Sequence, residues 1–297
     1  MASPHLKAVI FDVGGVVCKS PLLAIAAYER EQGLPDNYIN CAISARGSHG
    51  AWQRFERGEM PLFPFYEAFG QQLSDTTVNN PCYADYCRRK SLACPKLPDK
   101  LAINGRELFG RMMRDSRSLD EAVVEAIRRI RGASGYLLLT TGLRPSLTRD
   151  PATRRWRVIA LTNNFSSNAS DMLAEAPPSA ELYPGVTLQS ELAFLGWEDG
   201  PTPPALRALF DDFCDSSTLG MRKPEPGFYL LACERNGIEP SHAVFLDDLG
   251  MNLKVAQSLG METIHVPIGR SHSAIEQLER KLGIELTTER LRTLPKL

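Results

Sequence analysis

Hydrophobic positions along the chain follow two patterns. A continuous apolar run at residues 8–17, AVIFDVGGVV, is interrupted only by Asp12 and two glycines. A run of this kind is typical of a parallel strand that is buried on both faces. RVIALT at 157–162, HAVFLD at 242–247 and METIHV at 261–266 predict three more strands, with helical segments between them. The C-terminal half of the chain therefore alternates strand and helix.

Helical periodicity dominates most of the remaining chain. PLLAIAAYEREQG has a wide apolar face and stops at Gly33. SLDEAVVEAIRRIRG carries a capping-box pair, Ser118 and Glu121, at its start. SAIEQLERKLG repeats that signature at Ser273 and Glu276. These three segments are predicted to be amphipathic helices.

Strand and helix alternation predicts an α/β fold, a parallel sheet with helices on both faces. The first strand must join that sheet, because a lone buried strand has no partner. We therefore expect residues 1–17 and 150–297 to form the α/β core, with 18–149 inserted as a mainly helical cap over the sheet. Inside this insertion, residues 79–98 look like loops. YLLLTT, in the segment 136–156, is a candidate for an extra strand.

Composition excludes several classes of protein. Apolar residues make up 43% and charged residues 23% of the chain, with a net charge of −1, so a nucleic-acid partner is not expected. No apolar run is long enough to span a bilayer, and a strand starting near Lys7 leaves no room for a secretory signal peptide. The seven scattered cysteines lack the CxxC pairs of a zinc site and predict reduced thiols in the cytoplasm. The sequence carries no signal about the oligomeric state.

Residues able to do chemistry lie at the ends of the predicted strands and in the loops of the α/β region. They are Asp12, Thr162, Asn163, Lys223, Asp247, Asp248 and Asn252. Singly, each has an ordinary explanation as a helix cap, a solvated lysine or an acidic pair at a helix start. Gathered at one sheet edge, three carboxylates repel one another unless a cation lies among them, and an all-oxygen set suits Mg²⁺. A lysine with a hydroxyl and an amide would hold a phosphoryl group, which a carboxylate can attack.

Four motifs, in this order, resemble one family. FDVGGVV, LTNN, GMRKPEPGFY and VFLDDLGMNLKVAQSLGM are similar to motifs of the haloacid dehalogenase superfamily of hydrolases, and close to those of the N-terminal phosphatase domain of soluble epoxide hydrolase and its relatives. The resemblance covers roughly residues 7–20 and 157–290. It implies a Rossmann-like core with an inserted cap. The hydrolase half that opens epoxides has no counterpart in these motifs, so epoxide hydrolysis is not implied.

The resemblance also implies a role for each motif residue. Asp12 would be the nucleophile and a Mg²⁺ ligand. The further ligands would be the backbone carbonyl of Gly14 and the carboxylate of Asp248, supported by Asp247 and Asn252. The phosphoryl oxygens would be bound by Thr162, Asn163 and Lys223, with Lys223 also acting in catalysis. The partner implied is a small-molecule phosphate or diphosphate.

One position departs from the family pattern. Phosphatases of this family usually carry a second aspartate two residues after the nucleophile as a general acid, and this chain has Gly14 there. General acid catalysis typically contributes about 10²–10⁴ in rate. The glycine favours leaving groups that depart without protonation, such as diphosphate or an acyl phosphate.

The predicted function is a Mg²⁺-dependent hydrolase of phosphate esters or anhydrides that works through an aspartyl-phosphate on Asp12. The alternative is a terpene cyclase or phosphatase acting on a prenyl diphosphate, for which MPLFPFYEAF at 60–69 would supply apolar surface. Two further alternatives are a 2-haloacid dehalogenase, disfavoured because that chemistry needs no metal, and a binding protein without turnover.

Overall fold

The computed structural model describes residues 3–133, 156–165 and 179–287. Its five strands form one parallel sheet in the order β3-β2-β1-β4-β5. The strands are β1 (Ala8–Phe11), β2 (Arg157–Thr162), β3 (Asp212–Asp215), β4 (Ala243–Asp247) and β5 (Glu262–His265). The predicted α/β class is confirmed, and the first strand lies at the centre of the sheet.

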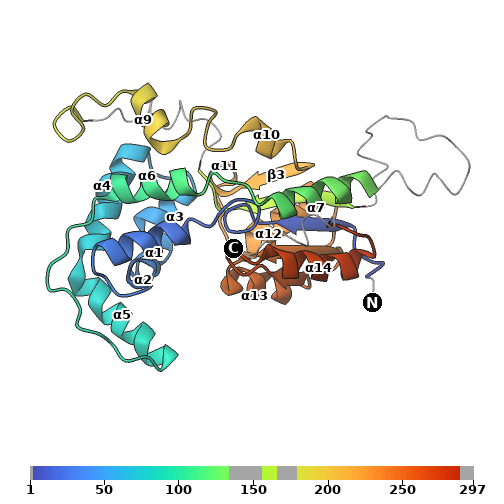
Figure 1. Ribbon diagram of the computed structural model, residues 1–297, viewed down its shortest axis with the longest axis horizontal. Coiled ribbons are helices and arrows are strands. Elements are labelled where there is room, and N and C mark those ends of the chain that lie inside the picture. The colour runs from blue at the N-terminus through green and yellow to red at the C-terminus, as the bar shows by residue number, and fades with distance from the viewer. Residues whose placement is uncertain (1–2, 134–155, 166–178, 288–297) are drawn as a thin grey trace, which may run out of the picture.

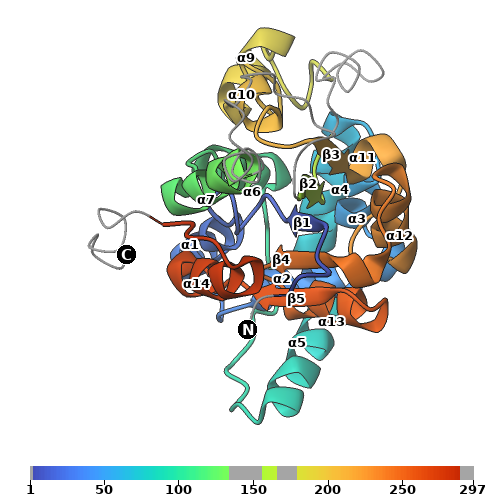
Figure 2. The same ribbon diagram turned by 90° about the vertical axis from the view of Figure 1, so that its right-hand side faces the viewer.

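Helices cover both faces of this sheet, as Figure 2 shows. They are α7 (Glu121–Gly132), α12 (Pro226–Arg235), α13 (Gly250–Ser258) and α14 (Ser271–Leu282). Successive strand residues point to opposite faces. Val9 and Phe11 therefore pack with α7 and α14, whereas Ala8 and Ile10 pack with α12 and α13. Burial on both faces explains why β1 is a continuous apolar run.

A separate helical region lies beside the sheet, to the left in Figure 1. Its helices are α1 (Leu22–Glu31), α2 (Tyr38–Ala45), α3 (Ala51–Glu56), α4 (Leu62–Ser74), α5 (Thr76–Lys90) and α6 (Gly105–Asp115). They pack around their own buried cluster, which is rich in aromatic rings. Phe165, three residues beyond the end of β2, belongs to this cluster. The helical region therefore adjoins the carboxyl edge of the sheet.

Smaller elements complete the described chain. They are the short 3-10 helices Gly47–His49 and Pro240–His242 and the helices α9 (Leu188–Leu195), α10 (Pro204–Arg207) and α11 (Ser216–Leu219). Helix α9 packs on α6, and α7 packs on the sheet although it lies inside the predicted insertion. The domain boundaries at residues 17 and 150 stay predictions. No helix within 3–133, 156–165 or 179–287 has the length and apolar character to cross a membrane.

Several local predictions were wrong. Residues 79–90, expected to be loops, belong to α5, which begins at the side-chain cap of Asp75 and accommodates Pro81. Buried Tyr83 and Cys87 pack this helix into the helical region, so tertiary contacts outweigh the proline signal. Strand β3 was missed, because its four residues DFCD carry two carboxylates and no alternating apolar pattern. Most of 136–156, with the candidate strand YLLLTT, lies outside the described residues.

Both predicted capping boxes were wrong as well. Helix α7 is capped by Asp120, whose carboxylate accepts hydrogen bonds from two backbone amides, and Ser118 lies before it. The N-cap of helix α14 is Arg270, three residues before the predicted cap, so Ser273 is inside the first turn and donates to the carbonyl of Arg270. In each case another residue starts the helix, although the helix itself was predicted correctly.

Candidate active site

Parallel register brings the predicted residues to one edge of the sheet. Asp12 directly follows β1, while Thr162 and Asp247 are the last residues of β2 and β4. These three strands are neighbours, so their carboxyl ends meet. One carboxylate oxygen from each of Asp12, Asp247 and Asp248 lies within 4.8 Å of the others. Lys223 reaches the same place from the loop before α12.

The ammonium group of Lys223 lies between two carboxylates. Its Nζ is 2.8 Å from Asp12 Oδ1 and 2.7 Å from Asp247 Oδ2, and the side chain is 1% exposed. Burial by itself lowers the pKa of a lysine, but the two carboxylates outweigh burial and raise the pKa of Lys223. The side chain therefore stays charged and supplies a fixed positive charge beside Asp12.

Asp12 is a buried carboxyl group with two other carboxyl groups, Asp247 and Asp248, close to it. Burial raises its pKa well above the usual range, Asp247 and Asp248 raise it further, and Lys223 opposes them. The backbone amide of Val13 donates to Oδ1 at 2.6 Å, which fixes the rotamer of the carboxyl group. This edge of the sheet holds three carboxyl groups and one ammonium group. Additional positive charge there would therefore favour the ionised form of Asp12.

The two aspartates after β4 have different surroundings. Asp247 accepts hydrogen bonds from Lys223 Nζ, from the Leu249 amide at 2.8 Å and from Asn252 Nδ2 at 3.0 Å to each oxygen. The Asp248 carboxylate accepts a 3.3 Å bond from Ser20 Oγ and a bond from its own backbone amide. Burial and the neighbouring Asp247 raise the pKa of Asp248 to about 6. Asp248 thus keeps more free acceptor capacity than Asp247.

The two glycines after the first aspartate have different structural requirements. Gly15 has a φ of +87°, and a Cβ there would lie 2.2 Å from Asp248 Oδ2. At Gly14 a Cβ would meet only Pro21 Cδ, at the ordinary contact distance of 3.6 Å. The backbone therefore requires a glycine at 15, whereas the space around Gly14 accepts a side chain.

Asn163 is engaged with the loop that carries Lys223. Its Oδ1 accepts from the Lys223 amide at 2.7 Å and its Nδ2 donates to the Lys223 carbonyl at 3.0 Å. The side-chain amide of Asn163 is thus engaged by backbone atoms of Lys223. The expected contact of Asn163 with a phosphoryl group stays a prediction. Thr162 is buried and lines a cavity at this edge of the sheet. Sequence reasoning missed Ser20, because nothing in its local pattern distinguishes it from an ordinary loop serine.

A cavity of about 230 Å³ adjoins this edge of the sheet. Gly14 and Thr162 line the cavity where it meets the candidate site. Met113, Phe165 and Trp197 form apolar walls on the side of the helical region. No carboxylate lines it among the described residues. The cavity therefore offers a largely apolar space that begins at Val13 and Gly14, just after Asp12 in the chain.

The donor set at this edge fits a magnesium ion. Hard divalent cations bind carboxylate and carbonyl oxygens, and the three grouped carboxylates offer such atoms within 4.8 Å of one another. Asp12 and Asp248 are the residues with ligand capacity left, because Asp247 is engaged by Lys223, Leu249 and Asn252. The proposed ligand set stays a prediction for Asp12, Asp248 and the carbonyl of Gly14.

Comparison with protein-family models matches residues 6–260 to the haloacid dehalogenase-like hydrolase family. The chain belongs to this family. The resemblance stated from the four motifs is thereby confirmed, and the protein is a hydrolase-family member with the fold that such proteins share.

Curated relatives and solved structures are similar along most of the chain. Acyl-CoA dehydrogenase family member 10 of Mus musculus is 29% identical over 94% of this chain and 19% of its own length. Bifunctional epoxide hydrolase 2 of Rattus norvegicus is 25% identical over 94% and 39%. The chain therefore spans two fifths or less of these relatives. A magnesium complex of a HAD family enzyme from Bacteroides thetaiotaomicron aligns with a TM-score of 0.48 and 16% identity, covering 93% of this chain and 100% of the other.

Proposed function

We propose that this protein is a Mg²⁺-dependent hydrolase of phosphate esters or anhydrides that forms an aspartyl-phosphate on Asp12. The observation that carries the proposal is the position of the Lys223 ammonium, bonded to both Asp12 and Asp247 beside a third carboxylate. A positive charge held this close to the nucleophile neutralises the oxygens of an incoming phosphoryl group. Family membership makes a hydrolase the expected class.

The proposed reaction has two steps. A carboxylate oxygen of Asp12 attacks phosphorus, the bond from phosphorus to the leaving oxygen breaks, and that oxygen departs with the electron pair. A water molecule then attacks the phosphorus of the aspartyl-phosphate, which releases inorganic phosphate and regenerates the Asp12 carboxylate. Lys223 and Thr162 hold the phosphoryl oxygens in both steps. Mg²⁺, when held by Asp12, Asp248 and the Gly14 carbonyl, supplies charge neutralisation.

The leaving group is the point at which this chain departs from its family. Gly14 has no proton to give, and no carboxylate lines the cavity among the described residues. Leaving oxygens of low basicity, as in diphosphates and acyl phosphates, depart as anions without a general acid. We therefore propose that such substrates are turned over faster than simple alkyl phosphates.

The test is a substrate panel with and without Mg²⁺. Phosphate release is measured on alkyl and aryl phosphates, sugar phosphates, acyl phosphates and prenyl diphosphates. The proposal expects Mg²⁺-dependent phosphate release that is lost in Asp12→Asn. If 2-chloropropionate instead yields chloride without metal, the protein is a dehalogenase. Ligand binding without any turnover would make it a binding protein.

The apolar walls of the cavity favour one second candidate, action on a prenyl diphosphate. Phe165, Trp197 and Met113 would surround the hydrocarbon chain while the charged edge of the sheet holds the diphosphate. Product analysis separates the two candidates, since a cyclase yields a cyclised hydrocarbon or alcohol, whereas a phosphatase yields the linear prenyl phosphate and, after a second hydrolysis, the linear alcohol. The proposed location for either enzyme is the cytoplasm, on the cysteine pattern of the sequence.

A further inference from the structure

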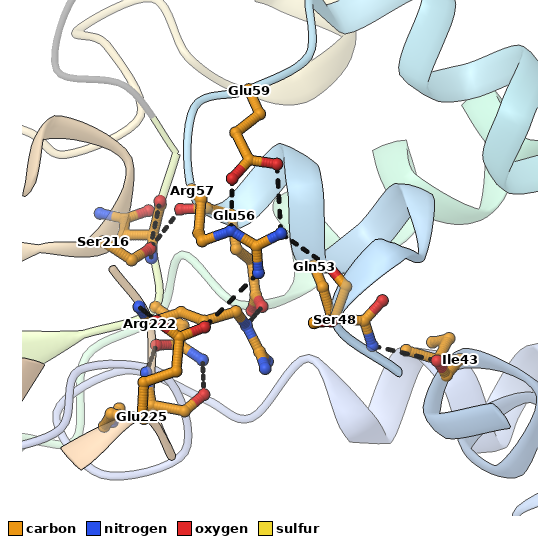
Figure 3. Close-up of polar contacts among 12 residues, drawn as sticks. Ile43, Ser48, Gln53, Glu56, Arg57, Glu59, Ser216, Arg222 and Glu225 are labelled. Atoms are coloured by element: carbon orange, nitrogen blue, oxygen red, sulfur yellow. Dashed lines mark hydrogen bonds and ion pairs between the residues drawn. The ribbon is translucent and has the colours of Figure 1, made fainter. Parts of the chain in front are cut away.

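A buried ion pair joins the helical region to the loop that carries Lys223. Glu56, the last residue of α3, is 4% exposed, and its Oε2 accepts from Arg222 Nε at 2.5 Å. The Trp52 side chain also hydrogen-bonds to this carboxylate. Burial raises the pKa of Glu56 and Arg222 opposes the shift. Figure 3 shows the two side chains meeting between the two regions.

The turn at residues 56–58 makes further contacts around the Glu56–Arg222 pair. Ser216 Oγ donates to the carbonyl of Glu56 at 2.5 Å, and Arg57 Nη1 lies 3.5 Å from Glu225 Oε1. Gly58 packs so closely that a Cβ there would lie 2.7 Å from the Ser217 carbonyl. The turn at residues 56–58 is therefore fitted against both the start of α11 and the loop at 222–225.

The covalent chain connects this contact to the site. Arg222 immediately precedes Lys223, whose backbone is bonded by Asn163 and whose Nζ lies between Asp12 and Asp247. We propose that Glu56 and Arg222 are positioning residues that set the location of Lys223 from the helical region. This inference rests on the role of Lys223 in the proposed function.

The physical reason is that Lys223 has a long side chain and needs a fixed backbone. Asn163 holds the loop from the sheet by hydrogen bonds to the Lys223 amide and carbonyl. The Glu56–Arg222 pair restrains the preceding residue from the opposite region. Displacement of a catalytic group by about 1 Å can reduce the rate about 100-fold, so loss of the pair has a measurable effect.

The decisive experiment compares Glu56→Gln in two backgrounds. With a phosphate ester that the wild type hydrolyses, Glu56→Gln should lower kcat/KM by about 10-fold or more. In the Lys223→Ala background the same change should lower kcat/KM by less than about 2-fold, because groups that act as one unit are not additive. Arg222→Met should behave as Glu56→Gln does, and Glu56→Asp should recover part of the loss.

The matched control is Glu191→Gln. Glu191 is also a fully buried carboxylate paired with an arginine, Arg106, but within the contact of α9 with α6. It should leave kcat/KM within about 2-fold while lowering thermal stability. Equal losses from Glu56→Gln in both backgrounds would show a merely structural role and overturn the inference. So would an unchanged kcat/KM in the otherwise native enzyme.

A readout independent of turnover separates this inference from the proposed function. Amide hydrogen exchange is measured on the metal-free protein for peptides that cover residues 219–229. Glu56→Gln should speed exchange there, including the Lys223 amide bonded to Asn163, and Glu191→Gln should not. If Glu56→Gln speeds exchange but neither the wild type nor any variant releases phosphate, the proposed function is refuted, whereas the link between Glu56 and the Lys223 loop is retained. Unchanged exchange would refute the link itself.

Discussion

The carboxyl edge of the sheet and the interior of the helical region are both buried, but they are built from opposite kinds of side chain. At the edge, Lys223, Asp12 and Asp247 are held by charge-assisted hydrogen bonds of 2.7–3.0 Å. The helical interior is aromatic, with the rings of Phe55 and Phe65 stacked at 4.1 Å between centroids. A buried polar group is costly unless it is paired, whereas buried rings gain free energy wherever they pack.

This difference separates chemistry from stability. Changes at the sheet edge should alter turnover or metal affinity far more than the fold, since the charges there repel one another in the absence of a cation. Changes in the aromatic interior should act mainly on the free energy of unfolding. Phe165 is the residue that joins the two, because it follows β2 and packs with Phe55 at 4.9 Å between ring centroids.

The largest expected effect is at the nucleophile. Asp12→Asn should reduce kcat by about 10⁴-fold or more, because the amide cannot attack phosphorus. The folded state should persist, since the amide can still accept the hydrogen bond from Val13. Phosphate release and circular dichroism on the same sample provide the measurement. Near-normal release would remove the nucleophile assignment.

The next effect distinguishes the two glycines. Gly15→Ala should lower kcat/KM by about 100-fold, because its Cβ would lie 2.2 Å from the Asp248 carboxylate and displace it. Gly14→Ala is the matched control and should stay near wild type, since its Cβ has only an ordinary contact. Similar losses in both variants would show that the close approach to Asp248 is not what matters.

The third effect is a pH dependence of Mg²⁺ affinity. The pKa of Asp248 is about 6 in the metal-free protein, so protons compete with the cation below that pH. Affinity should therefore fall as the pH drops below 6, by up to about 10-fold per unit for each competing carboxyl group. Calorimetric titration of Mg²⁺ between pH 5 and 7.5 measures it. Asp248→Asn should bind more weakly and show a flatter profile.

The same shift affects the metal-free protein with the opposite sign. A carboxyl group whose folded pKa exceeds its unfolded value binds its proton more tightly in the folded state. The contribution of Asp248 to the free energy of unfolding should therefore grow as the pH falls from about 6 toward the ordinary value of 3.8. The difference in thermal midpoint between wild type and Asp248→Asn across that range checks the sign.

A smaller effect is expected from adding a general acid. Gly14→Asp has room for its Cβ and should raise kcat/KM about 10-fold on alkyl phosphates, whose leaving oxygens most need a proton. On acyl phosphates the gain should be absent. The measurement is log(kcat/KM) against leaving-group pKa, which should be steep in the native enzyme and flatter in the variant. Parallel slopes would mean that another group already donates the proton.

The smallest effect on turnover should come from Phe165→Ala. It should cost about 3–5 kcal/mol of unfolding free energy, as expected for a buried phenylalanine, and change kcat by less than about 10-fold. Phe69→Ala, inside the helical region, is the control. Because Phe165 joins the two regions, its loss should also lower the m-value of urea unfolding, which Phe69→Ala should leave unchanged.

The sequence by itself determined the parallel strands other than β3, and the polar residues at their carboxyl ends. Each is encoded locally, by an apolar run such as VFLD and the polar residue that ends it, so Asp12, Thr162 and Asp247 were predictable. Parallel pairing then brings their ends together by geometry alone. The starts of α7 and α14 were less predictable, because several neighbouring polar residues are able to begin a helix.

Only the tertiary structure decided how these groups are held. Three contacts join segments that are far apart in the chain. Lys223 pairs with two carboxylates, Asn163 bonds to the Lys223 backbone, and Gly15 lies close to Asp248. Helix α5 likewise forms in spite of Pro81, because Tyr83 and Cys87 are buried against neighbouring helices. Local patterns specify which residues end a strand, whereas the partner of a buried charge depends on contacts that only the folded chain creates.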